Sequence, residues 1–198
     1  ATAYTFFKHS TEVGEKNGKF DTTTYYFASI AADKAQKHDE AIEIFQKLIN
    51  FENNGMLPMM DEAQKISLYS TLAILYVNAK KDIDKGVEMI ATARTKYPNN
   101  YEVLVDYINI HIFAKKYTES IQALEAAIGM QPTNAFLYHK LGDVYNELLS
   151  DSLYDKKQEE YLTKFANPEK AYKKAVEIKP DYFDVYFNLG ALHVNKAV

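Results

Sequence analysis

The sequence predicts an all-α fold, a solenoid of about four and a half helix–turn–helix repeats preceded by one further helix. Apolar residues recur at spacings of three and four along most of the 198-residue chain, which places them on one face of a helix. Three prolines, Pro98, Pro132 and Pro180, close similar helical segments. The segments that follow these prolines carry large and small residues at matching offsets, which indicates an internal repeat.

The prolines give the length of the repeat. Pro98 and Pro132 are 34 residues apart. Pro180 follows Pro132 by 48 residues, which is the same period with an insertion of 14. Proline ends each helix pair because it cannot continue a helix.

Three slots of the repeat are found six, ten and thirteen residues after each proline. Two upstream segments fit the same template. The first slot holds Tyr25, Tyr69, Leu104, Tyr138 and Tyr186; the second holds Ser29, Ala73, Ile108, Gly142 and Gly190; the third holds Ala32, Tyr76, His111, Tyr145 and His193. Ile108 replaces a small residue in the second slot, so we expect the two helices of that repeat to pack further apart.

A second amphipathic helix follows each of these segments. Its apolar or small residues lie on one face at helical spacing. These stripes are Ala41, Phe45 and Leu48; Gly86, Ile90 and Ala93; Ser120, Leu124 and Ala127; and Tyr172 with Ala175. Small residues recur where the two helices of a pair must approach closely.

This pattern resembles the tetratricopeptide repeat (TPR), whose signature is a large aromatic, a Leu-Gly pair, an aromatic, small residues, a large apolar residue, alanine and proline. Tryptophan often fills the first slot in that family. This chain has 16 tyrosines and no tryptophan, and tyrosine fills that slot. The resemblance implies a right-handed superhelix in which the first helix of each pair lines a concave groove.

The expected organisation is a single solenoid over residues 1–198. Its parts are an N-terminal helix in 1–21, repeat 1 in 22–53, an inserted loop in 54–64, repeat 2 in 65–98, repeat 3 in 99–132, repeat 4 in 133–180 with an inserted, partly helical extension near 148–167, and the first helix of repeat 5 in 181–198. We expect the natural protein to continue beyond this helix, or the helix to serve as an end cap.

The composition and charge of the chain argue against several kinds of partner and of chemistry. The net charge of −4 leaves no basic footprint for nucleic acid. Cysteine is absent, which excludes thiol catalysis, disulfides and cysteine-based zinc sites. The uncharged stretch from Ile66 to Ala79 is too short to span a bilayer. We therefore expect neither a nucleic-acid nor a membrane partner, while the compartment stays open between the cytoplasm and export with removal of a signal peptide.

No motif for catalysis or cofactor binding is present, so we expect no enzyme activity and no cofactor. His139, Asp143 and Glu147 share one helix face and could in principle ligate a metal, but a polar stripe lining a groove is the favoured interpretation, without a metal. His111 and His193 occupy aromatic slots and are expected to pack in the core. The charged segment around Lys173 is expected to be a solvated helix face.

The functional prediction is a non-enzymatic scaffold that binds a peptide or partner protein along the groove. Apolar side chains would hold the side chains of a peptide, and asparagine would bond its backbone. The predicted groove residues are Tyr26, Ile30, Ile74, Asn78, Val105, Asn109, Ile112, Phe113, His139, Asp143, Asn146 and Phe187. The alternatives are a structural or self-associating segment, including a homo-oligomer, and a regulatory domain of a longer protein.

Overall fold

The computed structural model describes residues 2–56, 60–150 and 168–196, and all regular structure in these ranges is helical, which confirms the predicted all-α class. The chain divides into two compact units, Ala1–Asp106 (unit 1) and Tyr107–Val198 (unit 2), with the division inside α6. The elements are α1 (Thr2–Lys16), α2 (Thr22–Lys34), α3 (His38–Asn53), α4 (Glu62–Leu75), the π-helix η1 (Tyr76–Lys80), α5 (Ile83–Lys96), α6 (Tyr101–Phe113), α7 (Tyr117–Met130), α8 (Ala135–Ser150), α10 (Pro168–Ile178) and α11 (Phe183–Lys196).

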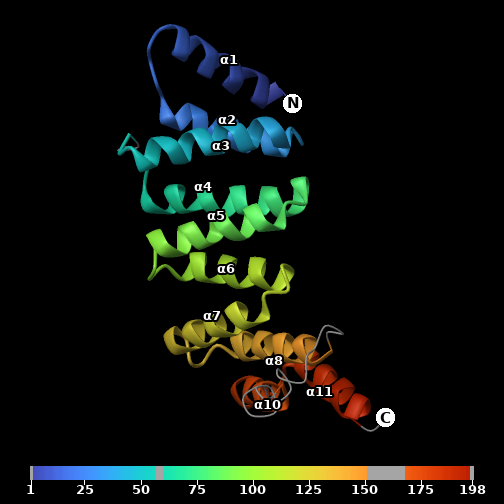
Figure 1. Ribbon diagram of the computed structural model, residues 1–198. Coiled ribbons are helices and arrows are strands. Elements are labelled where there is room, and N and C mark those ends of the chain that lie inside the picture. Colours follow the sequence, from blue (N-terminus) through green and yellow to red (C-terminus); the bar gives the residue numbers. More distant parts are fainter. Residues whose placement is uncertain (1, 57–59, 151–167, 197–198) are drawn as a thin grey trace. The chain divides into compact units, whose positions relative to one another are not determined.

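Unit 1 is built from helix pairs. Helices α2 and α3 lie side by side, as do α4 and α5, and α1 packs against α2 (Figure 1). The slot residues form its core: Tyr25 and Tyr69 of the first slot are 4% and 0% exposed, and Ser29 and Ala73 of the second slot are fully buried. The spacing read from the sequence therefore reports the buried face of each first helix.

Polar side chains start the first helix of several pairs. Asp61 accepts a hydrogen bond from the backbone N–H of Gln64 at 2.7 Å, and the side chain of Gln64 accepts one from the N–H of Asp61 at 3.1 Å. Asn100 and Asn134 similarly accept bonds from the N–H groups of Val103 and Phe136. These caps satisfy donors that have no partner within the helix.

The segment from the first slot to the closing proline is one residue longer in repeat 2 than in repeat 3, and the π-helix η1 accommodates the extra residue. Tyr69 precedes Pro98 by 29 residues, whereas Leu104 precedes Pro132 by 28. The i→i+5 bonding of a π-helix accommodates an inserted residue without breaking the helix. As a result Gly86 still meets α4 and η1, where a Cβ on this glycine would collide with the side chain of Val77.

The turn between the two helices of a pair uses a left-handed residue in three repeats. Gln36, Lys81 and Lys115 have φ values of 59°, 56° and 55°. A residue with a Cβ is strained in this conformation, and glycine is not.

Glycine at position 36 is therefore expected to stabilise unit 1. Gln36→Gly should raise the free energy of unfolding by about 1 kcal/mol, because relief of the strain exceeds the added entropy of the unfolded chain. Thermal unfolding followed by circular dichroism measures the change. The control is Ala35→Gly. Residue 35 has a φ of −85°, so this variant should lose about 0.5–1 kcal/mol of the free energy of unfolding. An equal loss in both variants would show that the backbone at Gln36 is not strained.

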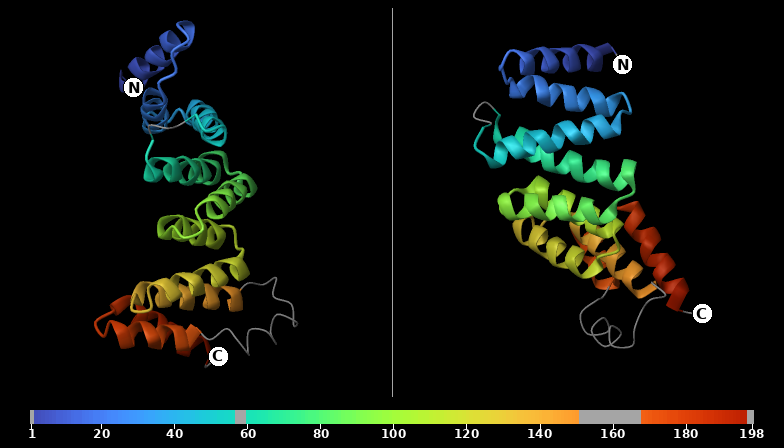
Figure 2. Two further views of the ribbon diagram at one scale, coloured as in Figure 1. Left: turned by 90° about the vertical axis from the view of Figure 1, so that its left-hand side faces the viewer. Right: turned by 45° about the horizontal axis from the view of Figure 1, so that its top comes forward.

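In unit 2, α8 packs against both α7 and α10, and α11 packs against α10 (Figure 2). Tyr172, Ala175, Val185 and Leu192 form a core cluster between α10 and α11.

Two predictions for unit 2 have different outcomes. His111 is 2% exposed and packs in the core as predicted, with Nδ1 2.8 Å from the carbonyl of Tyr107. The prediction for His193 is wrong, because its side chain is 58% exposed, with Nε2 3.7 Å from a carboxylate oxygen of Glu169 on α10. The predicted extension near 148–167 lies outside the described residues from position 151 onward.

None of the helices in the described ranges combines the length and the apolar character needed to cross a bilayer.

Candidate functional site

Unit 2 has a hollow among its first helices α6, α8 and α11. We call it the first-helix hollow. Its volume is about 190 Å³, and it is lined by Ile112, Lys140, Asp143, Val144, Asn146, Glu147, Tyr172, Asn188 and Ala191. The structure thus brings together Ile112, Asp143 and Asn146, three of the residues predicted to line the groove.

A hydrogen-bonded network forms the floor of this hollow. One oxygen of Asp143 accepts bonds from the hydroxyl of Tyr172 at 2.9 Å and from Nδ2 of Asn188 at 3.0 Å. Burial, and then the negative charge of Asp143, raise the pKa of Tyr172 above its ordinary value. The phenol is therefore a hydrogen-bond donor at neutral pH, and Asp143 is held in place from two other helices.

His139 belongs to this network and is 8% exposed. Its Nε2 lies 3.1 Å from Asn188 Nδ2, and its Nδ1 lies 2.9 Å from the hydroxyl of Tyr182. Both nitrogens are engaged within the protein. His139 thus positions Asn188 and Tyr182 rather than presenting a free ring nitrogen.

Aromatic side chains on the first helices of unit 2 are open to solvent. Phe113, Phe136 and Phe187 are 55%, 49% and 69% exposed, and Asn109 is also exposed. Phe136 and Asp143 are seven residues apart on α8 and therefore share one helix face. The position of Phe136 on this face is also visible in the sequence.

Unit 1 has a separate hollow of about 240 Å³ beside η1. It is lined by Asp33, His38, Thr71, Ile74, Leu75, Asn78 and Ala79. Ile74 is 43% exposed, and the π-helix carries Asn78 into the lining. The predicted residues Tyr26, Ile30 and Val105 are half-buried and line neither hollow; Tyr26 instead bonds Ser67 of α4 at 3.0 Å.

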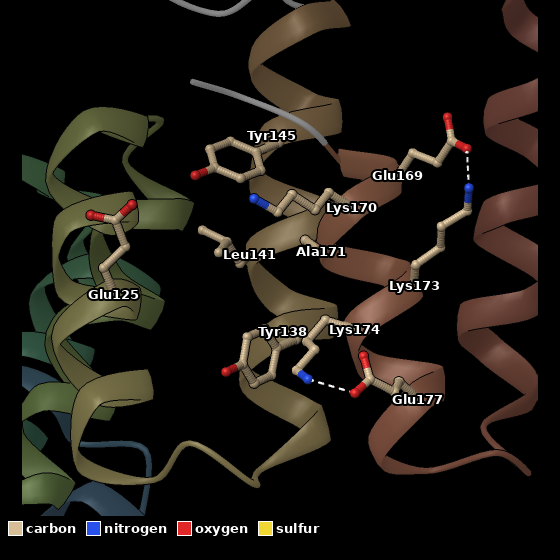
Figure 3. A pocket seen from close by; sticks show the side chains of 10 residues that line it. All are labelled: Glu125, Tyr138, Leu141, Tyr145, Glu169, Lys170, Ala171, Lys173, Lys174 and Glu177. Atoms are coloured by element: carbon tan, nitrogen blue, oxygen red, sulfur yellow. Dashed lines mark hydrogen bonds and ion pairs between the residues drawn. The ribbon is translucent and has the colours of Figure 1, made fainter. Parts of the chain in front are cut away.

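A wider groove, which sequence reasoning missed, lies on the other side of α8. We call it the second-helix groove; its volume is about 790 Å³, and it is lined by Glu125, Tyr138, Leu141, Tyr145, Glu169, Lys170, Ala171, Lys173, Lys174 and Glu177. Figure 3 shows Tyr138 and Tyr145 of α8 between Glu125 of α7 and the lysines of α10. The tyrosines occupy packing slots, so their sequence positions give no sign of this groove.

The charges of that groove are largely paired. Lys173 lies 2.7 Å from Glu169, and Lys174 lies 2.7 Å from Glu177. These pairs at helical spacing confirm the prediction of a solvated charged face on α10.

The His139, Asp143 and Glu147 stripe does not form a metal site in the structure. His139 Nε2 is 3.4 Å from Asp143, and both are held by Asn188. Within the described ranges, no three histidine or acidic side chains converge on a point where they could hold an ion.

Comparison with known proteins agrees with the helical repeat fold described above. Residues 170–196 match the model of a family described as the TPR repeat. The structure of MamA 41-end from Desulfovibrio magneticus RS-1 aligns with a TM-score of 0.64 at 20% identity, over 89% of this chain and 85% of that chain. YrrB, described as a TPR protein with an unusual peptide-binding site, aligns with a TM-score of 0.63 at 16% identity, over 98% of this chain and 81% of that chain. No curated protein matches the sequence.

With the helix pairs described above, these findings show that the chain has the fold of tetratricopeptide repeat proteins.

Proposed function

We propose that this chain is a non-enzymatic scaffold that binds an extended or helical peptide on the first-helix face of unit 2. The observation that carries the proposal is the group of exposed phenylalanines, Phe113, Phe136 and Phe187, on the helices that line a polar hollow. Exposed aromatic side chains are unfavourable in water and commonly anchor a partner.

The polar part of the surface suits a peptide backbone. Asn146 offers both a donor and an acceptor, and Asp143 accepts hydrogen bonds while Tyr172 and Asn188 hold it in one orientation. A preorganised site binds more tightly, because fewer side chains lose freedom on binding. YrrB, described as having an unusual peptide-binding site, supports the choice of a peptide as ligand.

The test uses peptides selected from a random displayed library against the whole chain. The variant Phe113→Ala with Phe187→Ala should weaken the selected peptides by about tenfold or more, because each substitution removes an anchor. Titration of labelled peptide measures the affinity. Circular dichroism should stay unchanged, because both side chains are exposed.

Two control variants locate the binding surface. Met130→Ala removes another exposed apolar side chain and should leave affinity unchanged. Glu125→Ala with Lys174→Ala alters the second-helix groove. Loss of binding in that variant, with retention in the phenylalanine variant, would assign the peptide to the second-helix groove and reject the proposal.

A further inference from the structure

The two oxygens of the Asp143 carboxylate have different surroundings. Oδ1 accepts hydrogen bonds from Tyr172 and Asn188, at 2.9 and 3.0 Å, and these bonds fix the orientation of the carboxylate. Among the described residues, Oδ2 bonds only Nζ of Lys140, and the distance of 3.5 Å is long for a charged pair. Because Asp143 lines the first-helix hollow, Oδ2 retains the capacity to accept a stronger hydrogen bond from a ligand.

A second carboxylate lies one helical turn further along α8. Glu147 follows Asp143 by four residues, is exposed and lines the same hollow. Its side chain forms no ion pair with any residue in the described part of the chain. Residues four apart on a helix have Cβ atoms about 5–6 Å apart, so the two carboxylates can bond one cation together.

The first-helix face of unit 2 is negatively charged around this hollow. Asp184 is exposed on α11 four residues before Asn188, so it shares the helix face that lines the hollow. Of the described residues in the lining, Lys140 alone is basic, against the acidic Asp143 and Glu147. Such a surface attracts a cationic group of a partner and repels an anionic one.

Lys140 shows that this surface accommodates a cation beside an aromatic ring. Its Nζ lies 5.6 Å from the ring centroid of Phe136 and 3.5 Å from Asp143 Oδ2. A positive charge is stabilised both by the face of an aromatic ring and by a carboxylate. Phe187, the neighbour of Asn188 on α11, is a second exposed ring at this hollow. The surface therefore suits a basic side chain that has apolar neighbours.

We propose that the peptide ligand carries a basic side chain, arginine in preference to lysine, which enters the first-helix hollow and bonds Asp143 and Glu147. The inference rests on the proposed function, because it names the chemistry of the peptide that binds on this face. A guanidinium group is planar and has several N–H donors, so it can bond both carboxylates at once. Lys140 competes with it, since it places a like charge at the same acceptor.

Three displayed libraries of short random peptides test the chemistry of the ligand. They differ only in a central residue, which is fixed as arginine, leucine or glutamate. Selection against the whole chain should give arginine peptides that bind about tenfold more tightly than the best leucine peptides, because a charge-assisted hydrogen bond is gained. The glutamate library should give no binders. Equal affinities from the arginine and leucine libraries, or binders from the glutamate library, would overturn the inference.

Two charge variants of the hollow should change the affinity of a selected arginine peptide in opposite directions. Glu147→Gln should weaken binding by about three- to fivefold, the effect of losing an exposed ion pair. Lys140→Gln should strengthen binding by about threefold, because it removes a like charge and frees Asp143 Oδ2. Titration of labelled peptide at low salt measures both changes. An acidic ligand would give the reverse of both effects.

The second-helix groove offers matched controls. Glu125→Gln and Lys173→Gln make the same two substitutions there and should leave the affinity unchanged. A second control is the selected peptide with citrulline in place of arginine, which keeps the shape of the side chain without its charge. Glu147→Gln should not weaken this peptide; equal weakening of both peptides would contradict an ion pair with Glu147.

The outcomes separate this inference from the proposed function. If Phe113→Ala with Phe187→Ala weakens binding while Glu147→Gln and Lys140→Gln change nothing, the peptide binds on the first-helix face without a basic side chain in the hollow, and the inference is rejected. If none of the three libraries yields a binder, the proposed function fails as well. Circular dichroism of each variant should match the wild type, because Glu147 is exposed and Lys140 is half-buried.

Discussion

Valine in place of Gly142 is expected to cause the largest loss of stability in unit 2. The ring of Tyr172 fills the space where a Cβ would be, and Tyr172 is itself 2% exposed and bonded to Asp143. The tyrosine can move only by breaking that bond and disturbing the core between α10 and α11. Overpacking at such a site costs about 1–3 kcal/mol and occasionally more, and we expect a loss of about 3 kcal/mol.

Urea and thermal unfolding followed by circular dichroism measure this loss. A chain of this size should lose about 2–4 °C in Tm for each kcal/mol. The matched control is Gly129→Val on α7, where an added Cβ has open space and the change should be close to zero. If Gly142→Val is as stable as Gly129→Val, the close approach of α8 and α10 is not required for folding.

Glutamine in place of Glu52 is expected to be the most damaging single change in unit 1. The carboxylate is 6% exposed and accepts hydrogen bonds from the hydroxyls of Tyr69 and Tyr97, each at 2.6 Å, as well as from Lys96. It thereby joins α3 to α4 and to the end of α5. Loss of the charge weakens all three bonds and leaves the lysine without its carboxylate partner, which should cost about 2–3 kcal/mol.

The same carboxylate should make unit 1 sensitive to acid. Burial opposes ionisation, but the bonds from Lys96, Tyr69 and Tyr97 outweigh it and hold the pKa of Glu52 below its ordinary value. A group with a lowered pKa in the folded state stabilises the protein above its unfolded pKa, and this contribution is lost as the pH falls through the folded pKa. The loss should therefore appear below about pH 4.

Urea unfolding at neutral and acidic pH tests both expectations. Glu52→Gln should be less stable than the wild type near neutral pH, and the difference should shrink as the pH is lowered. Glu43→Gln is the control, because Glu43 is exposed on the same helix and should change little. A constant difference at all pH values would show that Glu52 acts through packing and not through its charge.

Such clusters explain two of the first-slot tyrosines. Tyr25 and Tyr69 are almost fully buried, yet the hydroxyl of each donates a hydrogen bond to a glutamate of the preceding helix. The indole of tryptophan could donate a hydrogen bond but has no acceptor, and it carries the donor at a different point of the ring. Tyrosine thus combines an apolar ring for the core with a hydroxyl at its edge.

Helix existence and pairing could be predicted from the sequence, because burial of one helix face imposes a period on the residues. Tyr69, Ala73 and Tyr76 are buried as their slots require. The π-helix illustrates a limit of prediction from the sequence. The extra residue of repeat 2 can be counted in the sequence, but its location depends on which backbone hydrogen bonds rearrange. His193 illustrates a second limit, because the side chain in a slot is buried only where a partner helix covers it.

The candidate site was predictable in part. Ile112, Asp143 and Asn146 were assigned to one surface, and they line one hollow. His139 shares their helix face, but its two nitrogens bond residues more than forty positions away, which no local pattern reveals. The second-helix groove escaped prediction for a similar reason, since its walls come from α7 and α10.

The sequence by itself determined the all-α repeat, the residues of each slot and the absence of thiol chemistry, because these follow from local spacing and composition. Only the tertiary structure decided which slots are covered, which carboxylates are buried and which glycines meet a neighbour. Gly142 and Gly190 are equivalent in the sequence, yet one is filled by Tyr172 and the other is open. The physical reason is that the burial and the pKa of a side chain depend on atoms that folding brings close to it. The position of a residue within its repeat does not determine whether such a neighbour is present.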